Sequence, residues 1–203
     1  MARTVAIGIQ NFDEVIEKNC FYVDKTAFIK EWWENEDKVT LITRPRRFGK
    51  TLAMSMLEQF FSVKYADKGS LFEGLFIWQE EKYHALQGTY PVISLSFANV
   101  KETNYRDTRR KICQIIASEY ARNAFLLDGN CLTEQERDTF RRKTVDMDDV
   151  EAALAISQLS EYLYRYYGKK AIILLDEYDT PMQEAYVGGY WEEVVAFTRN
   201  LFN

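Results

Sequence analysis

The sequence has little of several residues whose abundance would mark a particular class of protein. Only 9 Gly and 3 Pro occur in 203 residues, which indicates long regular elements and few irregular loops. The three cysteines (Cys20, Cys113 and Cys131) are odd in number and far apart, so they fit a reducing compartment better than a disulfide framework, and none has metal-site spacing. The single histidine, His84, makes a catalytic triad or a histidine metal site a poor prediction, and we expect it on an exposed helix or loop.

Long hydrophobic runs and an excess of positive charge are absent too. The sequence has no run of about 18 apolar residues that could span a membrane, and its N-terminus lacks the apolar stretch of a signal peptide. We therefore expect a cytoplasmic protein with no membrane contact. The net charge of −5 gives no general electrostatic footprint for nucleic acid, so any such contact would need a local basic patch. What is present, 47% hydrophobic and 15% aromatic residues, predicts a well-buried globular domain.

One stretch carries the strongest chemical signal. A short β-rich run, residues 39–43, is predicted to be the first core strand, and it leads into a segment that ends in Gly49, Lys50 and Thr51 before apolar residues follow at helical spacing. A strand, a tight loop, Gly-Lys-Thr and a helix are together typical of a phosphate-binding loop. Its amides and the helix N-terminus offer donors to a polyphosphate. Lys50 would reach the β- and γ-phosphates, and the Thr51 hydroxyl would bind Mg²⁺.

The entrance of this loop departs from the usual pattern G-x-x-x-x-G-K-[ST]. Arg44 stands where the first Gly is expected, which narrows the backbone angles available, and Pro45 removes an amide donor. Arginines compensate in part, because guanidinium groups are good phosphate ligands. The simpler alternative is a basic surface turn before an ordinary helix. The predicted nucleotide-binding loop residues are Arg44, Pro45, Arg46, Arg47, Phe48, Gly49, Lys50 and Thr51.

A second motif follows an apolar run near the C-terminus. Residues 171–175 are all apolar and predict a buried strand, and the carboxylates Asp176 and Glu177 come directly after them. Ligands of open α/β sheets bind beyond the carboxyl ends of the strands. Asp176 suits a role in holding Mg²⁺, and Glu177 suits orienting or deprotonating the attacking water. The alternative is an edge strand that runs into a polar loop.

The remaining pattern is mostly helical. A lead-in of two short helices precedes the loop, and Asp24 fits the N-cap of the second one. Residues 90–97 predict a second core strand. A basic cluster with Arg106, Arg109 and Arg110 opens a long helix and is most simply a solvated face. Two further helices carry start signals, a capping box of Thr133 with Glu136 and a cap at Asp148 or Asp149, and Gly168 is a natural stop for the second.

Five segments together resemble the bacterial predicted AAA-ATPase, or AAA-ATPase-like, domain family, and the resemblance covers nearly the whole chain. They are Ile7-Gly-Ile-Gln-Asn-Phe12, Tyr22-Val-Asp-Lys-Thr26, Thr43-Arg-Pro-Arg-Arg-Phe-Gly-Lys-Thr51, Leu71-Phe-Glu-Gly-Leu75 and Leu174-Leu-Asp-Glu-Tyr-Asp-Thr-Pro181.

The resemblance implies a P-loop fold in which Arg replaces the first loop Gly as a family trait. It also singles out Asp24 and Lys25, for which lining the nucleotide pocket is one interpretation and capping a helix is another. Members of the family are commonly longer and often carry a restriction-nuclease-like C-terminal domain. The strand expected after Asp176, which would sense the γ-phosphate, and an arginine finger do not occur before Asn203. We therefore expect a truncated gene or a fragment.

We predict a three-layer α/β, P-loop NTPase-like domain with a mostly parallel sheet and a helical insertion between its second and third core strands. The domain would span residues 1–203, with a lead-in at 1–36 and a core at 37–203. The predicted function is Mg²⁺-dependent ATP binding with ATP hydrolysis. Thr51 and Asp176 are the predicted metal ligands and Glu177 the catalytic carboxylate; adenine rests on the resemblance alone.

Three rival functions remain open. One is a nucleotide-gated interaction module that hardly hydrolyses ATP and has a protein partner or forms a homo-oligomer. Another is a nucleic-acid-associated motor or regulator, whose phosphate contacts would be Arg106, Arg109 and Arg110. A small-molecule kinase is a weaker alternative, because no lid or acceptor site can be recognised in the sequence.

Overall fold

The computed structural model describes residues 4–5, 8–43, 45 and 48–202. The chain divides into two compact units, Met1–Val92 and Ile93–Asn203, and each is described by itself. The α-helices of the first unit are α1 (Phe12–Glu17), α2 (Ala27–Asn35), α3 (Lys50–Phe61) and α4 (Glu81–His84), and its 3-10 helices are η1 (Val63–Tyr65), η2 (Gly69–Phe72) and η3 (Phe76–Gln79). Strand β1 (Val92–Ser96) begins at the boundary.

The second unit contains most of β1, one further strand and a series of helices. In chain order it contains α5 (Tyr105–Arg122), η4 (Ala124–Leu127), α6 (Glu134–Arg141), α7 (Asp149–Tyr167), β2 (Ile172–Asp176), α8 (Thr180–Gly188) and α9 (Trp191–Leu201). The helices α5, α6 and α7 therefore lie between the two strands in the sequence, as predicted, and the mixed α/β class is confirmed.

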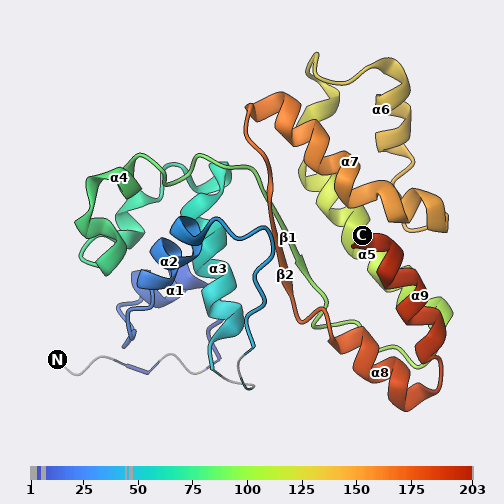
Figure 1. The fold of residues 1–203 in the computed structure, drawn as a ribbon, viewed down its shortest axis with the longest axis horizontal. Helices are drawn as coiled ribbons and strands as arrows, with labels where there is room; N and C mark the ends of the chain where they lie inside the picture. Colours follow the sequence, from blue (N-terminus) through green and yellow to red (C-terminus); the bar gives the residue numbers. More distant parts are fainter. Residues whose placement is uncertain (1–3, 6–7, 44, 46–47, 203) are drawn as a thin grey trace. The chain divides into compact units, whose positions relative to one another are not determined.

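An aromatic core holds the first unit together. Phe12 at the start of α1 stacks on Phe72 with ring centroids 5.1 Å apart, and Phe72 meets the edge of Phe60 in α3 at the same distance. All three rings are fully buried. Because α1 is short, it depends on this packing against α3 more than on its own helix propensity; Figure 1 shows α1, α2 and α3 gathered together.

The predicted first core strand at residues 39–43 is wrong. The structure assigns no strand there, and Val39 and Leu41 are 88% and 61% exposed. β-branched composition favours a strand only where a neighbouring strand completes the hydrogen-bond ladder and covers one face. Among the described residues of the first unit, the pairing is limited to two isolated parallel bridges, Val5 with Phe21 and Ser62 with Tyr90, and neither involves this segment.

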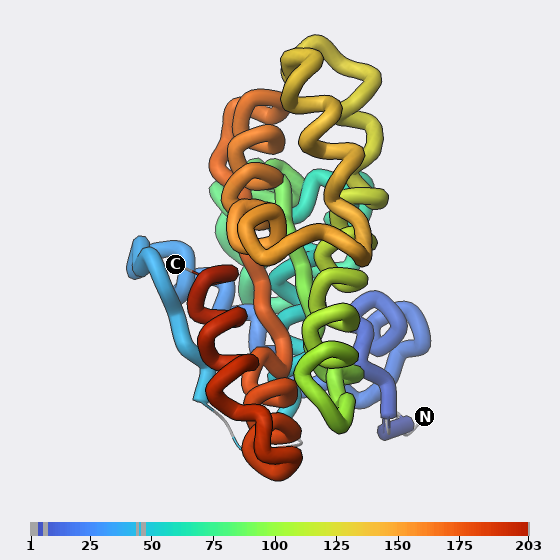
Figure 2. The backbone as a smooth tube through the Cα atoms, turned by 90° about the vertical axis from the view of Figure 1, so that its right-hand side faces the viewer, coloured from blue at the N-terminus to red at the C-terminus, as the bar shows by residue number. Residues whose placement is uncertain are grey.

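The second unit is built on a small parallel sheet in which β1 and β2 are neighbours. Phe97, directly after β1, donates its backbone N–H to the Asp176 carbonyl at 2.9 Å, so the carboxyl ends of both strands lie at the same edge. Both predicted strands are confirmed in position, within two residues of their expected ends, but the burial predicted for residues 171–175 is wrong. Ile173 is 44% exposed and only Leu174 of these residues is buried, because an apolar run is buried along its length only where both faces of its strand are covered. Figures 1 and 2 show α5, α7 and α9 side by side in this unit.

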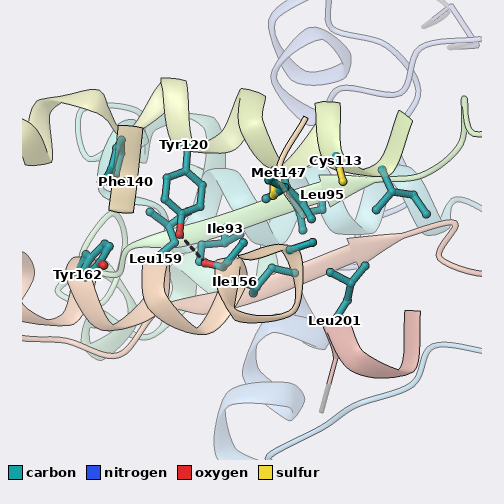
Figure 3. Close-up of a cluster of buried hydrophobic side chains, with 14 of the residues drawn as sticks. Ile93, Leu95, Cys113, Tyr120, Phe140, Met147, Ile156, Leu159, Tyr162 and Leu201 are labelled. Atoms are coloured by element: carbon teal, nitrogen blue, oxygen red, sulfur yellow. Dashed lines mark hydrogen bonds between the residues drawn. The ribbon is translucent and has the colours of Figure 1, made fainter. Parts of the chain in front are cut away.

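The core of the second unit lies where these helices meet the sheet. Ile93 and Leu95 of β1 are buried against residues of α5 and α7, among them Ile116 and Leu159. Figure 3 shows Ile93, Leu95 and Leu159 in this cluster, with the Tyr120 hydroxyl of α5 donating a hydrogen bond of 2.7 Å to the Ala155 carbonyl of α7. The buried hydroxyl is thus satisfied, as a polar group in an apolar core must be.

Local start and stop signals in this unit are confirmed. Thr133 and Glu136 form a capping box at α6, and Asp148 does the same with Glu151 at α7. Gly168 ends α7 in the left-handed conformation, with φ of 69°. These interactions need only residues a few positions apart, which is why the sequence predicts them well. The three-layer arrangement and the single domain over 1–203 remain predictions, since the sheet formed by the described residues has two strands.

Candidate functional site

The predicted phosphate loop ends in a turn that opens directly into a helix. Gly49 has φ of 75° and ψ of 29°, a left-handed conformation that favours glycine, and α3 begins at the next residue. No side chain in the described part of the chain caps this helix N-terminus, and the amides of a first helical turn have no acceptor within the helix. Lys50 and Thr51 occupy the first turn and are half-buried, whereas Phe48 and Pro45 are exposed. Arg44, Arg46 and Arg47 lie outside the described residues.

A second lysine reaches this loop from the lead-in. The Lys25 ammonium donates to the Phe48 carbonyl at 3.4 Å, and a Cβ built on Gly49 would lie 3.3 Å from the same Nζ. The structure therefore brings Lys25 and the Gly49 turn together, although 23 positions separate Lys25 from Phe48 in the chain. We call residues 22–26 the corner segment and residues 48–51 the loop segment.

Asp24 does not have the helix-capping role predicted for it. Helix α2 has Thr26 at its N-cap position, with no side-chain cap. Asp24 instead closes a local turn, because its Oδ1 accepts from the Thr26 N–H at 2.8 Å and from the Thr26 hydroxyl at 2.7 Å. Its Oδ2 accepts from the Phe76 N–H at 2.7 Å, and the Thr26 Oγ1 accepts from the Ile77 N–H at 3.1 Å. The pair thus ties the corner segment to the start of η3.

Tyr22 fixes the other side of the corner segment. Its hydroxyl accepts from the Lys25 backbone N–H at 3.3 Å and donates to the Met56 sulfur of α3 at 3.4 Å. Burial raises the pKa of Tyr22 to about 12, so the hydroxyl keeps its proton at neutral pH. Helix α3, which carries Lys50 and Thr51, is therefore connected to the segment that carries Lys25.

The predicted carboxylate pair lies in the second unit, at the carboxyl end of β2. Asp176 is the last residue of β2 and is half-buried, and Glu177 is exposed. Glu177 has φ of 48°, an uncommon conformation for a side chain with a Cβ, and such strain is concentrated at functional sites. The Glu177 carboxylate accepts from the Thr180 hydroxyl at 3.3 Å, which holds it over the start of α8.

Comparison with known proteins identifies the family of the chain. A family model described as "Predicted AAA-ATPase" matches residues 6–203, which is nearly the whole chain. The chain belongs to this family. A curated relative, described as an uncharacterized protein in the vnfD 5' region of Azotobacter chroococcum mcd 1, is 28% identical over 184 residues. The aligned region covers 89% of this chain and 30% of that relative, so the chain spans under a third of the relative's length.

No solved structure matches the chain. Within the part of this AAA-ATPase-like chain that the structure describes, no helix is both long enough and apolar enough to cross a membrane. The family description thus suggests a nucleotide-binding role.

The loop of this predicted AAA-ATPase is electropositive in its immediate surroundings. Among the described residues, no carboxylate oxygen lies within 4.0 Å of the ammonium group of Lys25 or Lys50. The neighbouring Asp24 carboxylate is already occupied by Thr26 and Phe76. An anion is therefore the ligand class that this arrangement favours.

Thr51 in the first unit has a hydroxyl, and Asp176 and Glu177 in the second unit have carboxylates; each is a hard oxygen donor of the kind that suits Mg²⁺. A protein-only metal cage is a different matter. No group of three or more His, Cys, Asp or Glu side chains placed to hold an ion occurs in the described part of the chain.

The arginine cluster of α5 is partly committed to the fold. The Arg109 guanidinium donates to Asp149 and to the Met147 carbonyl, both at 2.7 Å, and lies 5.5 Å from the centre of the Phe197 ring. Arg106 and Arg110 are exposed. His84 is also exposed, as predicted, and stacks on Trp78 with ring centroids 4.1 Å apart.

Sequence reasoning missed Tyr22 and Thr26 as supports of the site. Their partners, Met56 and Ile77, are 34 and 51 positions away in the chain, and no periodicity or capping pattern connects residues so far apart. The signal that could have found them is their position in the sequence, because both lie within three residues of Lys25, which the resemblance already singled out.

Proposed function

We propose that this member of the predicted AAA-ATPase family binds ATP with Mg²⁺ and hydrolyses it. The observation that carries the proposal is the left-handed Gly49 turn followed by an uncapped α3 that begins with Lys50 and Thr51. Backbone donors of a helix N-terminus beside a lysine form a suitable receptor for a polyphosphate. The family match supports a nucleotide as its source.

Each predicted residue has a defined part in this proposal. Lys50 contacts the β- and γ-phosphates, and the arginines at positions 44, 46 and 47 add donors at the loop entrance. Thr51 and Asp176 supply oxygen ligands for Mg²⁺, which when bound neutralises developing phosphate charge. Glu177 orients the attacking water and accepts its proton. The three-layer P-loop arrangement is part of the proposal.

The experiment is calorimetric titration of ATP, with and without Mg²⁺, together with phosphate release on the same samples. We expect Mg²⁺-dependent binding by the unchanged chain, and at least about a 100-fold loss of affinity in Lys50→Ala because several charge-assisted hydrogen bonds disappear. Lys18→Ala is the matched control, since Lys18 pairs only with Glu14 on the surface of α1, at 2.8 Å. Equal affinities for the unchanged chain and Lys50→Ala would overturn the proposed site.

A nucleotide-gated interaction module, acting on a protein partner or as a homo-oligomer, is the second candidate function. The exposed position of Glu177, held by a single hydroxyl contact, favours it over fast hydrolysis. Binding without phosphate release would support this module. Salt-dependent retention on DNA that is lost in Arg106→Ala with Arg110→Ala, but kept in Lys50→Ala, would support a nucleic-acid-associated role instead.

A further inference from the structure

We propose that Lys25 is a second phosphate-binding lysine, which exchanges its contact with the Phe48 carbonyl for one with the polyphosphate, and that Asp24 positions it without neutralising it. This inference rests on the proposed nucleotide function and assigns separate roles to two residues whose part in the pocket the sequence left open. Lys25 would be a ligand, whereas Asp24 would be a structural support.

The contact that Lys25 makes in the structure is weak and easily replaced. Its Nζ lies 3.4 Å from the Phe48 carbonyl oxygen, which is longer than the usual ~2.7–3.2 Å for such a bond. A phosphate oxygen is a stronger acceptor, because hydrogen bonds between ionised groups are roughly twice as strong as neutral ones. The carbonyl contact therefore serves to keep the ammonium at the loop until an anion arrives.

Gly49 provides the space for this approach. A Cβ at this position would lie 3.3 Å from the Lys25 Nζ, which is tighter than an ordinary contact. The glycine thus has two functions, since it accepts the left-handed backbone and lets an ammonium group lie against the turn.

The corner segment holds Lys25 in place from both sides. Asp24 and Thr26 tie it to the backbone of Phe76 and Ile77, with N–H to oxygen distances of 2.7 and 3.1 Å. Tyr22 ties it to Met56 of α3. A side chain on an anchored segment loses less conformational entropy when it binds a ligand than one on a free loop.

The charge arrangement identifies the ligand class. Asp24 is the carboxylate nearest to Lys25 along the sequence. Both of its oxygens accept hydrogen bonds from other donors, so it does not form an ion pair with Lys25. Among the described residues, neither Lys25 nor Lys50 has a carboxylate partner within 4.0 Å. A lysine on the loop segment and another held beside it, together with the amides of the helix N-terminus, fit a chain of phosphates better than a single carboxylate.

The test compares Lys25→Ala with Lys18→Ala in calorimetric titrations with Mg²⁺–ATP and, separately, with inorganic triphosphate. We expect Lys25→Ala to weaken both ligands by roughly 10- to 100-fold, the size of one lost charge-assisted hydrogen bond. Lys18→Ala should bind both as the unchanged chain does. Inorganic triphosphate has no base or sugar, so a loss with this probe assigns the contact to phosphate.

The outcomes separate this inference from the proposed function. If Lys50→Ala loses ATP while Lys25→Ala binds it normally, the nucleotide site stands and the role of Lys25 is wrong. If Lys25→Ala loses ATP but keeps inorganic triphosphate, Lys25 contacts another part of the nucleotide and the phosphate assignment fails. If the unchanged chain binds neither ligand, both proposals fail. Unchanged thermal unfolding of Lys25→Ala confirms that a loss of binding comes from the missing ammonium group.

Discussion

The charged side chains of α6 and α7 and those of the corner and loop segments are arranged in opposite ways. In the second unit, the Glu136 carboxylate accepts from Arg165 at 2.6 and 3.0 Å and from the Thr133 N–H at 2.8 Å. In the first unit, the Lys25 ammonium has one long contact to a carbonyl. The Glu136 carboxylate is thus paired with a cation of the protein. The Lys25 ammonium is held in position by a neutral carbonyl, so its charge can still interact with an anion.

This difference separates charged side chains that stabilise the fold from charged side chains that can bind a ligand. A paired charge contributes to stability, and its removal mainly changes the free energy of unfolding. A cation without an anionic partner contributes little to stability, and its removal mainly changes binding. Substitutions of both kinds of charged group test this separation, beginning with the one expected to change its readout most.

Glu177→Gln should have the largest effect, on ATP hydrolysis. Glutamine keeps the shape of the side chain but cannot accept a proton from water, so we expect phosphate release to fall by roughly 10²- to 10⁴-fold. ATP affinity should change little, because Lys50 and Thr51 remain. Single-turnover phosphate release measures the rate. A Glu177→Gln rate equal to that of the unchanged chain would remove Glu177 from the catalytic role.

Asp24→Ala should lower the free energy of unfolding more than a substitution of Lys25 or Lys50. It removes a carboxylate that accepts from the Thr26 N–H, the Thr26 hydroxyl and the Phe76 N–H. We expect the free energy of unfolding to fall by about 2–3 kcal/mol, measured by urea denaturation. Asp67→Ala, which removes an exposed carboxylate of the same unit, should change it by less than about 0.5 kcal/mol. Equal urea midpoints for the two variants would contradict the supporting role of Asp24.

Gly49→Ala has a matched control in Gly74→Ala. Both glycines have positive φ, 75° and 78°, so each substitution should cost about 1–2 kcal/mol of stability through backbone strain. The Cβ at Gly74 would meet nothing within 4 Å, whereas the Cβ at Gly49 would crowd the Lys25 ammonium. We therefore expect only Gly49→Ala to weaken ATP binding as well. An equal effect of both variants on affinity would show that the approach of Lys25 is irrelevant.

The smallest expected effect concerns the paired charges. Hydrogen bonds from Arg165 lower the pKa of Glu136 from 4.5 to about 2. Because the folded-state pKa is below the unfolded value, the stabilisation is complete above about pH 4.5 and is lost as the pH falls toward 2. Solvent screening reduces the contribution to about 1 kcal/mol. Urea unfolding of Glu136→Gln should therefore differ from the unchanged chain at pH 6 and match it near pH 2; a constant difference would refute the linkage.

Local patterns in the sequence predicted much of the second unit. The capping boxes at Thr133 and Asp148 and the helix end at Gly168 depend on side chains that reach backbone groups within one turn, so the pattern itself contains the interaction. The strand before Asp176 was predicted from its apolar run and found its partner in β1. The same reasoning failed at residues 39–43, because an apolar run does not specify whether another strand completes its ladder.

The candidate site was predictable only in part, for a related reason. Gly49 and Lys50 follow from a contiguous motif, and the structure confirms that a left-handed turn opens into a helix there. The approach of Lys25 to Phe48 and the bond from Phe76 to Asp24 join residues that are 23 and 52 positions apart. Such contacts depend on the packing of α1 and α2 against α3 and of η3 against α2, which no local pattern encodes.

The account depends most on the proposal that Lys25 and Lys50 both bind a polyphosphate. The most direct measurement is calorimetric titration of Mg²⁺–ATP into the unchanged chain, the Lys25→Ala/Lys50→Ala double variant, and Lys18→Ala. The account predicts binding by the unchanged chain and by Lys18→Ala, with no detectable binding by the double variant and no loss of its folded structure by circular dichroism. Equal binding by all three proteins would contradict the claim.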